Sequence, residues 1–151
     1  MKKEKGFTLV ELLVVVSVIA ILASTVLVNL RGARERAMDT RIISSLGQVR
    51  AVAEIIQSRT GVYTELCGGG AVGATLSSTT PDGLNVLRAD IDTNNGAGAP
   101  PACHADAASY CVSSQLNEAP TAAFWCINSA GRSNRIVTGS APCTSTVSTC
   151  M

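Results

Sequence analysis

Apolar residues form one long block near the amino terminus and become sparser after it. The run from Leu12 to Leu30 contains no charged residue, glycine or proline. With its flanks it gives about 24 positions, or ~36 Å of α-helix, which is enough to cross a ~30 Å hydrocarbon core. No small-residue cleavage site closes the run, as one would in an ordinary secretory signal peptide. The pattern predicts a membrane-anchoring helix over residues 7–30.

An amphipathic pattern continues this helix beyond the span. Apolar residues recur at steps of three and four, as on one face of an α-helix. These positions are Ala37 or Met38, Ile42, Leu46, Val49, Ala53 and Ile56. Gly61 follows Thr60 and suits a C-terminal cap. We expect one continuous helix whose second half, residues 31–61, lays its apolar stripe on a small domain.

The remaining residues, 62–151, are expected to form a globular ectodomain. Residues 62–108 are rich in glycine and small polar residues, which predicts mostly loop, with a short strand within Leu84–Ile91. Alternating patterns predict a small antiparallel sheet over residues 109–138, followed by an irregular tail over 139–151. The expected strands are Ser109–Leu116, Ala122–Ile127 and Arg135–Thr138. The fold class is therefore α+β, a long helix packed on a small sheet.

Charge placement predicts the orientation of the span. Lys2, Lys3 and Lys5 precede Phe7, and no lysine follows. Basic residues beside an apolar span stay cytoplasmic, so the ectodomain is expected outside the inner membrane. The net charge of +1 is too small to indicate a polyanionic partner, and we do not expect nucleic acid to bind.

Six cysteines lie beyond the span, and their number is even. They are Cys67, Cys103, Cys111, Cys126, Cys143 and Cys150. In an extracytoplasmic domain this predicts three disulfides, with 15 connectivities open. Because short loops close at low entropic cost, we favour Cys143–Cys150 and Cys103–Cys111, which leaves Cys67–Cys126. No close cysteine pair is present, so zinc is not expected.

Residues suited to catalysis are scarce. The chain has one histidine, no G-x-S-x-G or H-E-x-x-H motif and no phosphate-binding loop, so we expect no catalytic residues and no enzyme activity. Asp90, Asp92 and Asn94 alternate oxygen ligands as a calcium loop does. Asn95 and Pro101 stand where such a loop needs glycine and an acid. We expect a plain turn and no cofactor, with calcium as the one metal candidate.

Glu11 is the one charge inside the apolar block. A carboxylate within a bilayer helix costs roughly 2.5–3.5 kcal/mol on insertion scales. Such a residue needs a partner or a functional role.

The stretch "KGFTLVELLVVV", from Lys5 onward, resembles the signal shared by type IV pilins and type II secretion pseudopilins. The resemblance covers Lys5 to about Leu30, and beyond Tyr63 only the general layout is similar. It implies that a prepilin peptidase removes a leader of residues 1–6 by cutting between Gly6 and Phe7. The same enzyme would then methylate the new amino terminus at Phe7.

The resemblance also implies assembly into a filament through the amino-terminal helix. Glu11 of one subunit would then meet the Phe7 ammonium of a neighbour, because that attraction is strong at low dielectric. The other partner open to Glu11 is its own Phe7 ammonium, four residues back. The further partners implied are an inner-membrane assembly platform and its ATPase. The chain would begin as a single-pass inner-membrane protein and end in an extracellular or cell-envelope filament.

Three functions remain open on the sequence. We favour a subunit of a type IV pilus-like filament, since three disulfides suit exposure outside the cell. A type II secretion pseudopilin is the second. The third is a monomeric single-pass anchored binding module. Ala20 and Val28 stand where many family members have glycine and proline, so the branch within the family stays open.

Overall fold

The structure is a computed structural model of the chain. It describes residues 6–68, 74–77, 83–96, 100–117, 123–137, 142–143 and 150, apart from the side chains of residues 27–29. The chain divides into two compact units, Met1–Arg34 and Glu35–Met151.

Helix α1 is continuous over Leu9–Thr60, as the two joined patterns predict. It ends where Gly61 takes a positive φ of 82°, which a glycine adopts without strain. From Ile42 onward the predicted apolar stripe of its second half is fully buried, whereas Ala37 is exposed and Met38 is half-buried. Its members Ile42, Leu46, Val49, Ala53 and Ile56 are each 0% exposed. The predicted contact between this stripe and a small domain is confirmed.

A six-stranded antiparallel sheet forms the rest of the ectodomain, with strands in chain order across the sheet. The strands are β1 (Cys67–Gly68), β2 (Ala74–Leu76), β3 (Ala102–Ala105), β4 (Tyr110–Gln115), β5 (Ala123–Asn128) and β6 (Ser133–Val137). Strands β4, β5 and β6 match the three predicted ones. The prediction that 62–108 is mostly loop is wrong in part, because β1 to β3, a 3₁₀ turn at Thr64–Leu66 and a second helix lie there.

Helix α2 spans Leu84–Asn94, where the sequence analysis expected a short strand. That expectation is wrong because the apolar residues recur at a helical rather than a strand period. Leu84 and Ile91 are fully buried, two turns apart, and Leu87 between them packs against the same core. Arg88 and Asp92 add a salt bridge one turn apart on another face.

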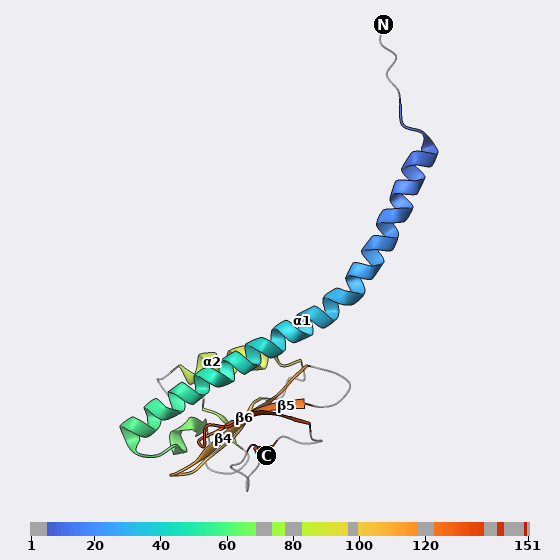
Figure 1. The fold of residues 1–151 in the computed structure, drawn as a ribbon. Helices are drawn as coiled ribbons and strands as arrows, with labels where there is room; N and C mark the ends of the chain where they lie inside the picture. Colours follow the sequence, from blue (N-terminus) through green and yellow to red (C-terminus); the bar gives the residue numbers. More distant parts are fainter. Residues whose placement is uncertain are drawn as a thin grey trace. The chain divides into compact units, whose positions relative to one another are not determined.

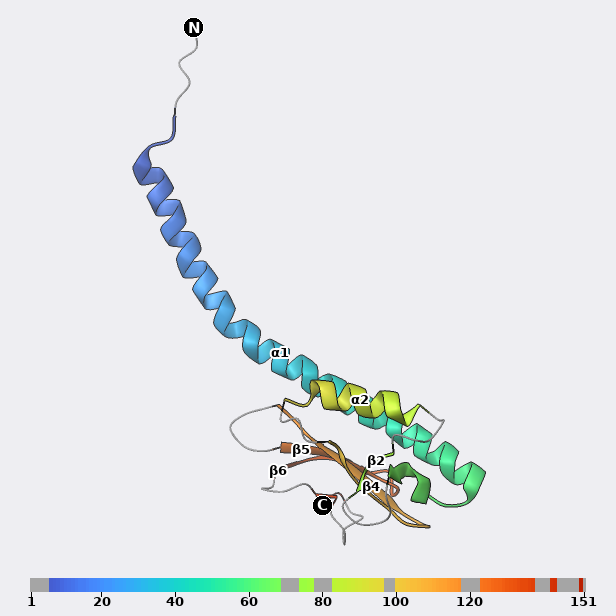
Figure 2. The same cartoon turned by 180° about the vertical axis from the view of Figure 1, so that it is seen from behind.

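The second half of α1 and helix α2 cover one face of the sheet, and the main core lies between them and the strands (Figures 1 and 2). Polar contacts fix the helices in place. Asp90 of α2 accepts hydrogen bonds from Arg41 Nε at 2.9 Å and from the Ser45 hydroxyl at 2.6 Å, both on α1. The buried Asp39 accepts two bonds from Asn117, one from its backbone N–H and one from its side-chain amide.

A second, smaller core lies on the opposite face of the sheet. It contains four of the cysteines and Ile136. Cys111 and Cys126 belong to β4 and β5, whereas Cys143 and Cys150 come from the carboxy-terminal tail. The sheet is thus covered by helices on one face and tied to the tail on the other.

Neighbouring positions on α1 give a matched test of this packing. Leu46→Ala should lower the free energy of unfolding by about 2–5 kcal/mol, because it empties a filled core site. Gly47→Ala should raise it by about 0.5–1 kcal/mol, because Gly47 is exposed in mid-helix and an added Cβ meets no atom within 4 Å. Urea unfolding of the disulfide-intact protein measures both. Equal effects of the two variants would contradict the packing described.

Candidate functional site

The first turn of α1 is closed by a reciprocal pair of side chains, Thr8 and Glu11. The backbone N–H and the hydroxyl of Thr8 both donate to Glu11 Oε2, each at 2.8 Å. In return, the backbone N–H of Glu11 donates to Thr8 Oγ1 at 3.3 Å. This is a capping box, in which the N-cap residue and the third helical residue each satisfy one otherwise unpaired backbone N–H.

The capping box gives Glu11 a local role that the sequence analysis missed. The signal was present, because Thr-x-x-Glu before an apolar run is the usual pattern of such a cap. Two hydrogen bonds to one carboxylate oxygen lower the cost of holding that group in an apolar medium. They leave Oε1 with no bond among those the structure gives to Glu11.

The predicted cleavage point lies just before this cap, in a segment without regular structure. Gly6 has no heavy atom within 4 Å of the position where a Cβ would stand, and Phe7 is 88% exposed. Among the described residues, none therefore covers the Gly6 side of the Gly6–Phe7 bond. In this full-length chain the Phe7 nitrogen belongs to a peptide bond, so the pairing of Glu11 with an ammonium group stays a prediction.

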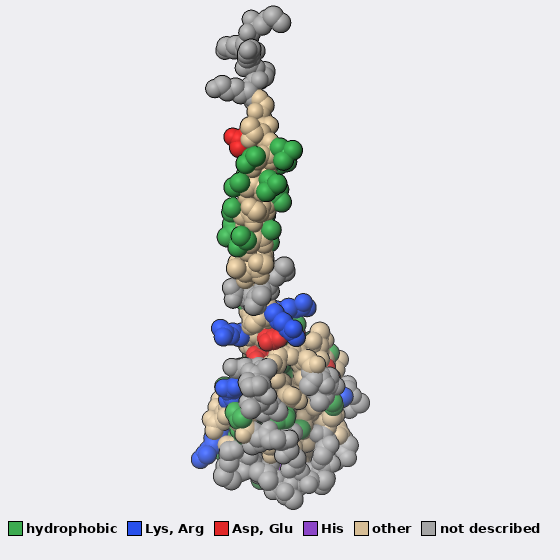
Figure 3. Space-filling view, turned by 90° about the vertical axis from the view of Figure 1, so that its right-hand side faces the viewer, with side chains coloured by type: hydrophobic (Ala, Val, Ile, Leu, Met, Phe, Trp, Pro, Cys, Tyr) green, Lys and Arg blue, Asp and Glu red, His purple; other side chains and the backbone are tan. Residues whose placement is uncertain are grey.

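The apolar span carries exposed hydrophobic side chains on all sides. Those at least 49% exposed are Phe7, Leu9, Val10, Leu12, Leu13, Val14, Val15, Val16, Val18, Ile19, Ile21, Leu22, Val26 and Leu30. Figure 3 shows hydrophobic side chains along the visible face of this segment, with one acidic group near its start. By length and composition, α1 can cross a membrane.

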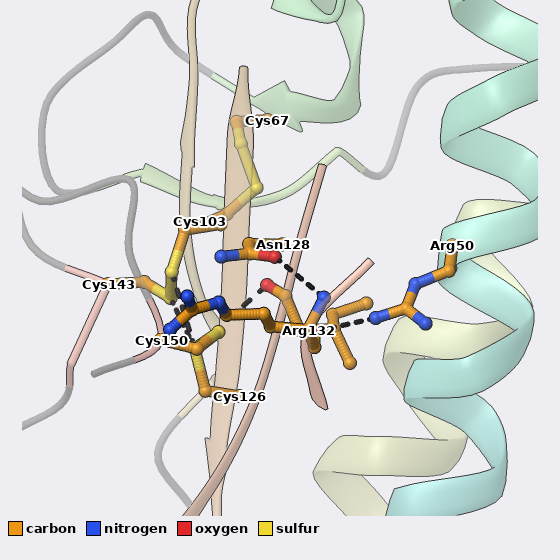
Figure 4. Close-up of a disulfide and its surroundings, with 10 residues drawn as sticks. Arg50, Cys67, Cys103, Cys126, Asn128, Arg132, Cys143 and Cys150 are labelled. Carbon is orange, nitrogen blue, oxygen red and sulfur yellow. Dashed lines mark hydrogen bonds between the residues drawn. A yellow bond between two sulfur atoms is a disulfide. The ribbon is translucent and has the colours of Figure 1, made fainter. Parts of the chain in front are cut away.

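All six cysteines form disulfides, which confirms the predicted number. The three favoured pairings are wrong. The bonds are Cys67–Cys103, Cys111–Cys143 and Cys126–Cys150. Figure 4 shows the Cys67–Cys103 and Cys126–Cys150 bonds.

The register of the sheet explains the error in pairing. Cys103 of β3 lies opposite Val112 of β4, so these two side chains share a face. Cys111 is next to Val112 on β4 and therefore points to the opposite face from Cys103. Their short loop therefore cannot be closed by a disulfide. Cys126 lies opposite Ser113, two residues from Cys111, and so shares a face with Cys111 rather than with Cys67. Face, and not loop length, determines the pairs.

The calcium candidate does not form a loop. Asp90, Asp92 and Asn94 all lie within helix α2, where residues two apart point to different sides. The carboxylate of Asp90 is bound by Arg41, and that of Asp92 by Arg88. Asn94 turns its amide N–H, a donor, toward Asp90. These geometries do not present converging oxygen ligands.

One strongly shifted pKa belongs to the core rather than to a cleft. Burial raises the pKa of Tyr110 to about 12, so its hydroxyl stays protonated at any physiological pH. Its ring packs at 5.0 Å from that of Tyr63. Nearby, Arg50 of α1 donates to the backbone carbonyl of Arg132 at 2.6 Å and ties the β5–β6 hairpin to the helix (Figure 4). These contacts are structural.

Comparison with known proteins places the same amino-terminal stretch in context. Residues 1–27 match the family model described as the prokaryotic N-terminal methylation motif. The chain is 44% identical over 64 residues to the type IV wide pilus major component PilA4 of Thermus thermophilus, covering 42% of this chain and 49% of that protein. It is 41% identical over 46 residues to the type II secretion system core protein G of Klebsiella pneumoniae, covering 30% of this chain and 33% of that protein.

A longer match extends into the ectodomain. The chain is 30% identical over 106 residues to the type IV major alpha-pilin of Moraxella bovis, covering 65% of this chain and 67% of that pilin. The chain belongs to the type IV pilin family. The match spans about half the length of the Thermus relative and about a third of the Klebsiella relative. No solved structure matches this pilin-family chain.

The capping box of this pilin-family chain can be tested by removing one hydroxyl. Thr8→Val should destabilise the first turn by about 1 kcal/mol, because the Glu11 N–H loses its acceptor and the carboxylate loses one donor. Amide hydrogen exchange of the full chain in detergent micelles should then be faster at Leu9–Leu12. Thr8→Ser should keep the wild-type rates. Unchanged exchange in Thr8→Val would show that the cap contributes nothing.

Proposed function

We propose that this chain is a structural subunit that is processed after Gly6 and polymerises through α1 into a type IV pilus-like filament. The observation that carries the proposal is the apolar surface of α1. Over residues 7–30 every side chain that the structure describes is exposed, and the only charge, that of Glu11, lies at the start of the helix.

An apolar helix of this kind is stable in only two environments. Lipid can surround it, or several copies of it can bundle together, because both remove the apolar surface from water. A monomeric anchored module needs lipid alone. It gives no reason for an acid inside the apolar block or for the Gly6–Phe7 junction. A filament subunit uses both environments in sequence, lipid before assembly and neighbouring helices after it.

Glu11 would supply the register of that bundle. Removal of residues 1–6 converts the Phe7 nitrogen into a charged amine, one turn before Glu11. The Thr8 bonds occupy Oε2 and leave Oε1 as an acceptor for a neighbour's ammonium. Between packed helices the attraction of the two charges is large, and an amine buried without a countercharge is strongly unfavourable.

The family contains both surface pilins and secretion pseudopilins. The similarity to the Klebsiella core protein G makes a pseudopilin the second candidate. Three disulfides in a small ectodomain favour a filament exposed outside the cell, where such bonds persist. A gene for a retraction motor beside this one would support a surface pilus. Genes for a secretin and its secretion partners would support the pseudopilus.

Assembly of such a filament requires other proteins. A prepilin peptidase would remove the leader and methylate Phe7, and an inner-membrane platform with its ATPase would extract the subunit from the membrane. The chain itself would act as a structural subunit and not as an enzyme. It would reside in the inner membrane with its amino terminus inside before assembly, and in the filament afterwards.

Processing can be read directly from the mature protein. Intact-mass analysis of the chain from membranes of cells holding the peptidase should show a start at Phe7 with one added methyl group. Gly6→Val should leave residues 1–6 attached, because a branched side chain next to the scissile bond hinders its approach to the peptidase. Recovery of wild-type chain that still starts at Met1 would overturn the processing step.

The role of the Glu11 charge can be separated from its role in the cap. Glu11→Gln keeps an acceptor for the Thr8 donors, since glutamine also serves at this position of a capping box, but it removes the charge. Its monomer level in the membrane should hold or rise, because an amide is cheaper than a carboxylate in lipid. Its filament yield, measured by shearing and electron microscopy beside a membrane immunoblot, should fall sharply.

Thr8→Val is the matched control for Glu11→Gln, because it weakens the cap and keeps the charge. It should form filaments at a yield much closer to wild type. Normal filaments from Glu11→Gln would show that assembly does not need the Glu11 charge. Equal loss in both variants would assign the defect to the helix start rather than to the ion pair.

A further inference from the structure

Two disulfides on the face of the sheet away from the helices touch each other. Cys126 Sγ, bonded to Cys150, lies 3.5 Å from Cys111 Sγ and 3.5 Å from Cys143 Sγ. The sulfurs of Cys111, Cys126 and Cys150 all lie within 4.8 Å of one another. Figure 4 shows three of these cysteines, Cys126, Cys143 and Cys150, clustered beside the strands.

The four cysteines come from two sources. Cys111 and Cys126 are fixed on neighbouring strands, whereas Cys143 and Cys150 belong to the tail. All four are buried, and they form the smaller core together with Ile136. Each tail sulfur is therefore bonded to one strand sulfur and lies within 4.8 Å of the other.

We propose that these four cysteines form an internal thiol–disulfide exchange site, through which the tail can switch between two attachments to the sheet. A disulfide is exchanged when a thiolate attacks one of its sulfurs. Here Cys126 Sγ lies 3.5 Å from both sulfurs of the Cys111–Cys143 bond, so it faces that bond from the side. Rotation of the side chains would bring it into line with the bond, as exchange requires, without unfolding of the sheet.

The exchange needs a catalytic thiolate but no net oxidant or reductant. Cys150 is buried in the structure, so an external thiolate attacks it when local opening exposes it. The attack forms a mixed disulfide at Cys150 and releases Cys126 as a thiolate. Cys126 then attacks Cys143, so that the Cys126–Cys143 bond forms, the Cys111–Cys143 bond breaks and Cys111 leaves as a thiolate. Cys111 attacks Cys150, which forms Cys111–Cys150 and returns the external thiolate. Two disulfides are present before and after.

Strand geometry limits the exchange to one alternative connectivity. Cys111 lies opposite Asn128, and Cys126 is two residues from that position, so the two strand cysteines are diagonal neighbours. Diagonal Cα atoms lie about 7–8 Å apart, beyond the ~7 Å limit for a disulfide without backbone movement. A strand-to-strand bond is therefore disfavoured. The alternative is Cys111–Cys150 with Cys126–Cys143, in which both bonds still join the tail to the sheet.

The third disulfide does not take part. Cys67 and Cys103 belong to the main core, on the helix-covered face of the sheet. Cys103 and Cys111 point to opposite faces, as the register of β3 and β4 requires. The Cys67–Cys103 disulfide is thus an internal control for exchange. It belongs to the same ectodomain, but the sheet separates it from the four-cysteine site.

A single substitution places a thiol inside the site. Full-length Cys150→Ser, purified in detergent, leaves Cys126 without its partner. After incubation at neutral pH, acid quenching and alkylation of the unfolded chain, peptide mapping should find the label shared between Cys126 and Cys111, with a new Cys126–Cys143 bond. Cys143→Ser should likewise share its label between Cys111 and Cys126.

The control is Cys67→Ser, which leaves a thiol on Cys103 and should give label at Cys103 alone. If one substituted chain does not fold, as judged by circular dichroism, wild-type chain with a catalytic amount of glutathione decides the question. It should gain Cys111–Cys150 and Cys126–Cys143 bonds while Cys67–Cys103 persists. Label confined to Cys126 in folded Cys150→Ser, or a wild-type connectivity unchanged by glutathione, would overturn the proposal.

Discussion

The apolar surface of the first half of α1 is the constraint on which the rest of this molecule depends. Its side chains are exposed in the chain alone, and moving each large one out of water is worth about 1.5–3 kcal/mol. Among the side chains that the structure describes in this half, residues 6–26 and 30, all are exposed, whereas the second half of the helix packs into the core of the sheet. The chain must therefore be completed by lipid or by other helices.

The start of the helix shows how a charge is accommodated in such a surface. Thr8 holds one oxygen of Glu11 with two hydrogen bonds, which both closes the helix and reduces the cost of the carboxylate. The same carboxylate keeps capacity for a further donor. Glu11 thus has a local role at the start of the helix, beside the role in assembly that we propose for it.

The ectodomain has a small hydrophobic core and is stabilised in two further ways. Helix α1 buries one stripe on one face of the sheet, and the tail is attached to the other face by two disulfides in contact. Because these bonds cross-link distant parts of the chain, they restrict the unfolded state and stabilise a domain with few aromatic residues. Their contact also makes the tail's attachment exchangeable, as we propose.

The sequence predicted the features that depend on periodicity and count. The stripe from Ile42 to Ile56, the three central strands and the number of disulfides all follow from local pattern. The disulfide partners did not follow, because they depend on which face of the sheet each cysteine occupies, and that is set by register between strands. Helix α2 was missed because Leu84 and Val86 alternate as in a strand, and only the burial of Leu84, Leu87 and Ile91 with an exposed Val86 shows the helical period.

The most direct test of the central claim is a structure of the filament by electron cryomicroscopy. We expect the apolar halves of the α1 helices to form the centre, with the sheets outside. We also expect each Glu11 carboxylate to lie within about 4 Å of a neighbouring subunit's Phe7 nitrogen. A filament whose centre is formed by the ectodomains, or one in which Glu11 contacts only its own Thr8, would contradict the account.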